Sequence, residues 1–260
     1  MSDNIQPRGT DDATLAKPLY TPIKRRSFFM YAGATAGATA LLLAGCDDDS
    51  DDPIMANTVN VGSGDVGVLN YAYALEQLEA AFYTQLRDGA YYRGLAASSA
   101  EKQILDDLYY HEVIHREFFK AAITAAAPTA IIKGLTPNFG AVNFGDRTSV
   151  LGTAKAFEDL GVAAYNGAGQ YITSPLYLTI AGKIVSVEAR HAAIIRDLVQ
   201  EGSFAANDVV TITSANTSNV ATNAAPANSS LERSKSPAEV VAIANTFLAD
   251  GSKLNVSGLV

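Results

Sequence analysis

Four long stretches of this chain each carry one glutamate inside an otherwise apolar helical face, and this feature restricts the possible folds most strongly. The glutamates are Glu76, Glu112, Glu158 and Glu188. Apolar residues lie three, four and seven positions from each glutamate, which places them on the same face of a helix. An unpaired carboxylate is costly in an apolar core. The sequence therefore predicts an all-α bundle whose four glutamates meet around something positive.

Capping residues and helix breakers give the expected helix ends. The expected helices run from about Asp65 to Asp88, from a capping-box pattern at Ser98 and Glu101 to about Ala127, from Thr148 or Ser149 to about Tyr171, from Ser174 to about Gln200, and from a capping box at Ser236 to about Ala249. The long, glycine-containing segment between the second and third helices can return the chain to the opposite end of a bundle.

Two of the four glutamates are followed by a histidine at the next helical turn. The motifs are Glu112-x-x-His115 and Glu188-x-x-His191, and they use two of the three histidines of the chain. This spacing lets a carboxylate and an imidazole reach the same metal ion.

The two halves of the chain also resemble each other. Glu76-x-Leu-x-x-x-x-Tyr83 in the first half matches Glu158-x-Leu-x-x-x-x-Tyr165 in the second, and a Glu-x-x-His motif follows each. The sequence therefore reads as two copies of one helix pair, which would place two metals side by side.

This pattern resembles the ferritin-like di-iron and di-manganese carboxylate proteins. The segments 75–83, 158–167 and 187–193 are similar to the bacterial ferritin-like domain family related to desiccation-associated proteins, and the resemblance covers roughly residues 60–200. It implies a ferritin-like four-helix bundle with a long crossover and a short C-terminal fifth helix. It also implies two iron or manganese ions held by Glu76, Glu112, His115, Glu158, Glu188 and His191.

Three further side chains lie near the expected site. Tyr83 and Tyr165 are either hydrogen-bond donors to ligand carboxylates or plain core residues. Glu79 shares the inward face of Glu76, but Gly161 occupies the corresponding place in the second half. Glu79 is therefore an extra ligand, a proton relay or an ion-pair partner, and the residues alone leave these alternatives open.

A rival interpretation uses His111-Glu112-x-x-His115, the His-Glu-x-x-His signature of zinc metalloproteases. In that interpretation His111 and His115 bind zinc and Glu112 is the general base. It leaves Glu188, His191 and the internal symmetry without a role. In the favoured interpretation His111 points away from the site and is an ordinary edge residue.

The N-terminus resembles an export signal. Arg25 and Arg26 precede an apolar stretch that ends in Leu43-Ala-Gly-Cys46. This is similar to a twin-arginine signal peptide fused to a lipobox, in which Cys46 is lipidated. The stretch is shorter than the roughly 20 apolar residues that a membrane span needs, although an uncleaved anchor is the alternative.

The expected organisation has five parts. They are the signal peptide 1–46, an acidic disordered tether 47–60, the bundle 61–202, a loop or small hairpin 203–235 with a weak strand candidate at 209–213, and a C-terminal helix and tail 236–260. A formal net charge of -8 argues against a nucleic-acid partner. A single cysteine allows no internal disulfide and no cysteine cluster for a rubredoxin-like electron relay.

These features predict an exported protein, held on the periplasmic or outer side of a bacterial envelope by lipidated Cys46. The expected activity is redox chemistry with oxygen or peroxide as the small oxidant, with no catalytic residue beyond the metal centre. The alternative is a non-catalytic, metal-stabilised envelope or stress scaffold. The oligomeric state is open, and a homo-oligomer is compatible with the sequence.

Overall fold

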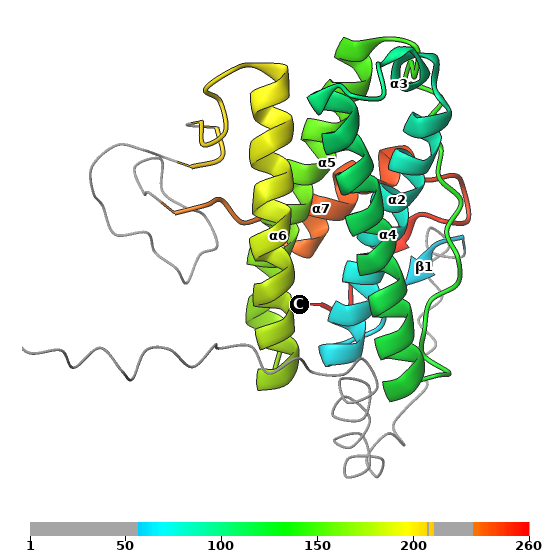
Figure 1. The fold of residues 1–260 in the computed structure, drawn as a ribbon. Helices are drawn as coiled ribbons and strands as arrows, with labels where there is room; N and C mark the ends of the chain where they lie inside the picture. The colour runs from blue at the N-terminus through cyan, green and yellow to red at the C-terminus, as the bar shows by residue number, and fades with distance from the viewer. Residues whose placement is uncertain (1–56, 207, 211–230, 260) are drawn as a thin grey trace, which may run out of the picture. The chain divides into compact units, whose positions relative to one another are not determined.

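The computed structural model describes residues 57–206, 208–210 and 231–259 (Figure 1). The predicted signal peptide, Cys46, most of the predicted tether and part of the strand candidate at 209–213 lie outside these residues. In the described part of the chain, no helix combines the length and apolar character that a membrane span requires.

Four long helices dominate the structure and confirm the predicted all-α bundle. They are α2 (Gly64–Asp88), α4 (Ala100–Ala126), α5 (Arg147–Ala168) and α6 (Pro175–Val199). Helix α2 packs mainly against α4, and α5 packs mainly against α6. The two helix pairs that the internal repeat predicts are therefore also the two main packing units.

Most of the predicted helix ends agree with the structure. Ser174 caps α6 by accepting a hydrogen bond from the Tyr177 amide at 3.4 Å, and Pro175 is the first helical residue. Ser236 and Glu239 form the predicted capping box of helix α7 (Pro237–Ala244). Helix α7 is shorter than predicted, because a 3-10 turn, η3 (Asn245–Phe247), replaces its last turn.

The predicted capping box at Ser98 is wrong by one residue. The capping residue of α4 is Ser99, whose hydroxyl accepts from the Lys102 amide at 3.2 Å. Glu101 does not fold back onto the cap, because its carboxylate binds the Arg147 guanidinium at 2.8 Å and the Tyr91 hydroxyl. Glu101 thus forms an ion pair with another helix instead of the local capping interaction that the sequence predicts.

Two short elements were not predicted. A one-turn helix, α3 (Ala90–Gly94), follows α2, and strand β1 (Val59–Asn60) pairs in parallel with strand β2 (Leu254–Asn255). The described end of the predicted disordered tether is therefore part of the fold. Val59 is buried there, and its amide donates to the Lys253 carbonyl at 2.7 Å.

The crossover between α4 and α5 runs along the bundle, so that α5 starts at the end where α4 also starts (Figure 1). Arg147, at the start of α5, contacts Glu101 near the start of α4 and donates to the Leu198 carbonyl near the end of α6 at 2.9 Å. At the other end, Asp65 accepts from the Thr173 and Ser174 amides, between α5 and α6. Helices α4 and α5 are therefore parallel, and the predicted long crossover is confirmed.

A buried asparagine on α2 holds this crossover in place. Asn70 is 1% exposed, and its side-chain amide donates to the Val61 and Ala130 carbonyls at 3.1 and 2.7 Å. Its carbonyl oxygen accepts from the Ile132 amide at 3.1 Å. All of its polar groups are thus engaged with backbone, as a buried amide requires.

A buried arginine joins α6 to α5 and to the segment after α6. Arg196 is 2% exposed and binds Asp159 and Asp208 through paired hydrogen bonds of 2.6 to 2.9 Å. Val210 then pairs antiparallel with Glu232. The described ends of the predicted 203–235 segment therefore meet, while its middle lies outside the described residues.

The close approach of the C-terminal segment to α5 gives a stability prediction. A Cβ atom at Gly167 would lie 1.8 Å from the Lys235 carbonyl oxygen, whereas nothing lies within 4 Å of a Cβ at Gly152 on the same helix. We expect Gly167→Ala to destabilise the fold by about 1–3 kcal/mol, because backbone must move. Gly152→Ala should stabilise it by roughly 0.5–1 kcal/mol through helix propensity. Chemical denaturation of both variants checks the pair, and equal effects would contradict it.

Candidate metal centre

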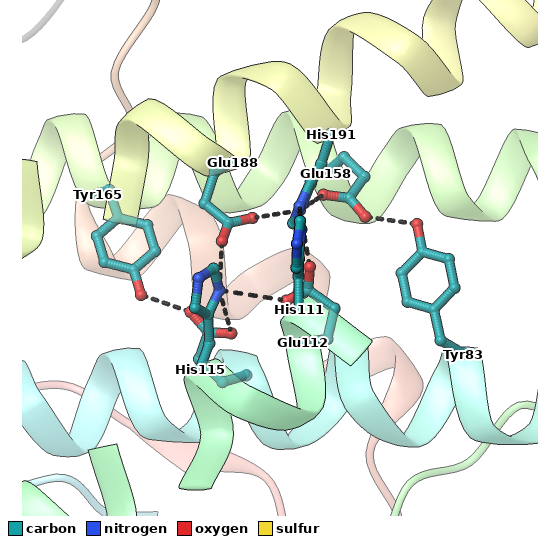
Figure 2. A network of polar contacts seen from close by, with 9 residues as sticks. Tyr83, His111, Glu112, His115, Glu158, Tyr165, Glu188 and His191 are labelled. Atoms are coloured by element: carbon teal, nitrogen blue, oxygen red, sulfur yellow. Dashed lines mark hydrogen bonds and ion pairs between the residues drawn. The ribbon is translucent and has the colours of Figure 1, made fainter. Parts of the chain in front are cut away.

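The six predicted ligands meet in the core of the bundle, between its four long helices (Figure 2). The four glutamates, one from each long helix, are all 0% exposed. His115 and His191 lie one turn after Glu112 on α4 and Glu188 on α6, and their side chains are 13% and 4% exposed. Helical periodicity therefore predicted correctly which side chains point inward.

The ligand atoms form two overlapping groups. Glu76, Glu112, His115 and Glu188 offer atoms within 4.8 Å of one another, and so do Glu112, Glu158, Glu188 and His191. Glu112 and Glu188 belong to both groups. Each group thus has one glutamate and one histidine of its own and shares two glutamates with the other, which is the arrangement that two adjacent ions need.

Eight of the polar atoms in these groups are buried and make no well-aligned hydrogen bond within the described residues. They are Oε2 of Glu76 and Glu158, both carboxylate oxygens of Glu112 and Glu188, and Nδ1 of His115 and His191. The two imidazole nitrogens lie 2.8 Å from carboxylate oxygens of Glu188 and Glu112, so the polar atoms of the cluster face one another rather than separate hydrogen-bond partners. Buried polar atoms that lack well-aligned hydrogen bonds are rare in native structures, and cations bound between these two groups would satisfy them.

Two tyrosines lie at opposite ends of the cluster (Figure 2). The Tyr83 hydroxyl donates to Glu158 Oε1 and the Tyr165 hydroxyl donates to Glu76 Oε1, each at 2.5 Å. Each bond crosses between α2 and α5 and follows the internal repeat. Both tyrosines therefore fix a glutamate and leave its second oxygen facing the centre.

Without a metal, the histidines supply the positive charge of the cluster. Burial opposes the charge of His115, but the nearby Glu112, Glu188 and Glu76 carboxylates outweigh it and raise its pKa to about 12. The pKa of His191 is raised against burial by Glu158, Glu112 and Glu188.

The glutamates respond unequally to this environment. Burial acts to raise the pKa of Glu188, but His115 and His191 lie against its two oxygens and lower the pKa to about 2. Burial raises the pKa of Glu76 to about 8. The cluster therefore holds protons where metal cations would otherwise balance the charge.

His111 does not point away from the site as predicted. Its Nδ1 lies 2.8 Å from Nε2 of His191, across the gap between α4 and α6. The prediction failed because the sequence shows only that His111 lies at the edge of the helix face, and not which neighbouring helix that edge meets. The zinc-protease interpretation gains no support, because neither group of possible metal ligands among the described residues contains His111.

Glu79 is buried with the cluster but stands outside both groups. It is 5% exposed, and its Oε1 lies 3.1 Å from the position that a Cβ atom at Gly161 would occupy. The described residues give it no hydrogen bond or ion pair. The predicted ion-pair role is therefore not observed, and the absence of a side chain at Gly161 makes room for this carboxylate.

An apolar cavity of about 30 Å³ lies against Tyr165. Its walls come from α2, α4, α5 and α6 and include Leu75, Phe119 and Ala181. A space of this size admits a small molecule, but a water molecule needs two or more polar partners, and these walls are almost wholly apolar. The cavity is therefore suited to a small apolar molecule close to Glu76.

A family model described as "ferritin-like domain" matches residues 64–201, which is more than half of the 260-residue chain. The match begins at the first residue of α2 and ends just after α6, so it covers all six side chains of the cluster. No curated protein matches the chain.

The protonation state of the cluster gives a prediction for metal uptake. A metal-bound imidazole must lose the proton from its ligating nitrogen. Because the raised pKa values keep His115 and His191 protonated at neutral pH in the metal-free protein, and burial raises the pKa of the Glu76 carboxyl to about 8, we expect uptake near pH 7.5 to release at least two protons per chain. Uptake should weaken as the pH falls. Calorimetry in two buffers of different ionisation enthalpy measures the release, and a value near zero would contradict the assigned charges.

Proposed function

This chain belongs to the ferritin-like domain family, and we propose that it is an exported protein that binds two iron or manganese ions and uses them in redox chemistry with oxygen or peroxide. The observation that supports the proposal most strongly is the set of eight buried ligand atoms that converge in two overlapping groups without well-aligned hydrogen bonds. A purely structural core has no reason to retain four carboxylates at this cost.

The ligand types favour iron or manganese. Carboxylate oxygen and imidazole nitrogen suit both metals, and geometry and metal availability decide between them. The set contains no thiolate, and each group has more carboxylates than a closed structural zinc site commonly has. Bound as a pair, such ions would supply electrons to a small oxidant by changing their oxidation state.

Each residue has a distinct part in this proposal. Glu112 and Glu188 would supply ligand oxygens to both positions, because each belongs to both groups. Glu76 and Glu158 serve one position each, and their tyrosine partners prevent them from rotating away. His115 and His191 complete one position each and give up a proton when the metal enters.

The apolar cavity supports the proposal that the oxidant is a small apolar molecule such as dioxygen. Its wall includes Tyr165, which hydrogen-bonds to Glu76, so a molecule held there lies one side chain from the cluster. The reductant comes from outside or is the substrate itself, since the chain has one cysteine and no cysteine cluster to relay electrons.

Metal analysis of the purified chain tests this proposal. We expect about two iron or manganese ions per chain. We also expect oxygen or peroxide consumption with a reductant present. The double variant Glu112→Ala plus Glu188→Ala should lose both metals, because it removes the shared ligands. Glu117→Ala is the matched control, since Glu117 lies on the same helix with its side chain 53% exposed.

The other outcomes separate the alternatives. Two bound metals without oxidant turnover would support the alternative function, a non-catalytic scaffold stabilised by metal. No metal in a folded bundle would reject the metal proposal altogether. A single zinc ion that persists in the double variant would revive the protease interpretation.

Export and lipid anchoring form a separate part of the proposal and are supported by the Arg25-Arg26 pair and the Leu43-to-Cys46 lipobox. We expect Cys46→Ser to release the protein from the membrane fraction, because it removes the acylated thiol. Replacing both arginines with lysine should keep the protein inside the cell. Fractionation of a bacterial host measures both effects. A Cys46→Ser chain that stays membrane-bound would support the uncleaved anchor instead.

A further inference from the structure

We infer that the two metal positions are unequal, and that His111 is a positioning residue that makes the His191 position the tighter one. This inference rests on the proposed dinuclear site. It concerns a residue outside the Glu-x-x-His motifs, and it follows from the places where the two halves of the chain differ.

The orientation of His191 is the first step. Its Nδ1 faces the cluster, 2.8 Å from Glu112 Oε1 and 3.5 Å from both Glu158 Oε2 and Glu188 Oε2. Its Nε2 therefore points outward, where His111 Nδ1 lies 2.8 Å away (Figure 2). The two rings are nearly parallel, with an interplanar angle of 19° and centroids 5.0 Å apart.

This contact fixes the proton of the ligand. A neutral imidazole that presents the Nδ1 lone pair to a metal carries its hydrogen on Nε2. That hydrogen can be donated to Nδ1 of His111, which accepts it. A hydrogen bond to the outer nitrogen of a ligand histidine holds the ring in place, selects the tautomer and makes the ring a stronger donor to the metal.

His115 has no equivalent support. Its Nδ1 also faces the cluster, 2.8 Å from Glu188 Oε1, but its outer nitrogen makes no hydrogen bond within the part of the chain that the structure describes. The residue that corresponds to His111 in the second half is Val187, which immediately precedes Glu188. A valine side chain can neither donate nor accept, so the internal symmetry is broken at this pair of positions.

A second break in the symmetry lies on α2, the helix that carries Glu76. Glu79 stands where the other half has Gly161, with its carboxylate directed at that glycine. The two halves therefore differ in carboxylate content as well as at the place of His111.

Stepwise titration of the metal-free chain with manganese(II), followed by electron paramagnetic resonance, tests the inference. In the wild type, the first equivalent should give the signal of isolated ions, and the coupled signal of a pair should grow only with the second. We expect His111→Leu to weaken the first binding step roughly 10- to 100-fold, because the ligand loses its hydrogen-bond partner.

Two further variants separate positioning from general structural damage. His111→Asn has nearly the same size as His111→Leu but keeps an acceptor near the place of Nδ1, so it should restore most of the first step. Val187→Leu changes the corresponding residue of the second half without altering its hydrogen-bonding capacity, so it should leave both steps unchanged.

The outcomes that overturn the inference differ from those that overturn the proposed function. Two equal steps in the wild type, or a first step unaffected by His111→Leu, would refute the inequality while leaving the dinuclear site intact. An equally weak first step in His111→Leu and His111→Asn would refute the hydrogen-bond explanation. A chain that binds no manganese at all would instead refute the metal site on which the inference rests.

Discussion

Four carboxylates packed together inside an apolar bundle repel one another, and the rest of this structure is arranged around that repulsion. Each long helix carries one of them, so no helix can rotate about its axis without moving its glutamate. Two histidines neutralise part of the charge, and two tyrosines hold the outer oxygens of Glu76 and Glu158. The cost of burying charge thereby fixes the relative phase of the four helices, because the compensating groups come from different helices.

Helical periodicity predicts the inward-facing ligands because a charged residue within an apolar helix face is easy to recognise in a sequence. An apolar face interrupted by glutamate at one position identified the inward side of all four helices, and the Glu-x-x-His spacing identified both histidines. Contacts between neighbouring helices produce no comparable pattern in the sequence. Glu101 was assigned to a local cap and instead binds Arg147, and His111 was assigned to the outside and instead meets His191. Both errors concern an edge residue whose partner depends on which helix lies beside it.

The pairing of β1 with β2 could not be predicted for a related reason. Each strand has two residues, which is too short for alternation of apolar and polar residues to be recognised, and the partners are far apart in the chain. Their pairing depends on the bundle having already brought the two ends of the described fold together. The crossover behaves in the same way, since it is held by contacts distant in sequence, among them those of Asn70 and Gln77 on α2 and of Ser252 in the C-terminal segment.

The strand pair also has a mechanical consequence if the chain is anchored through Cys46, as proposed. A pull on residue 57 reaches β1 before it reaches α2, and β1 is fastened to the C-terminal segment by hydrogen bonds from the Val59 and Val61 amides to the Lys253 and Asn255 carbonyls. Tension applied to the chain would thus act first on the hydrogen bonds between β1 and β2. The helix that carries Glu76 would bear load only after this strand pair opens, so movement of such an anchor would not disturb the spacing of the carboxylates.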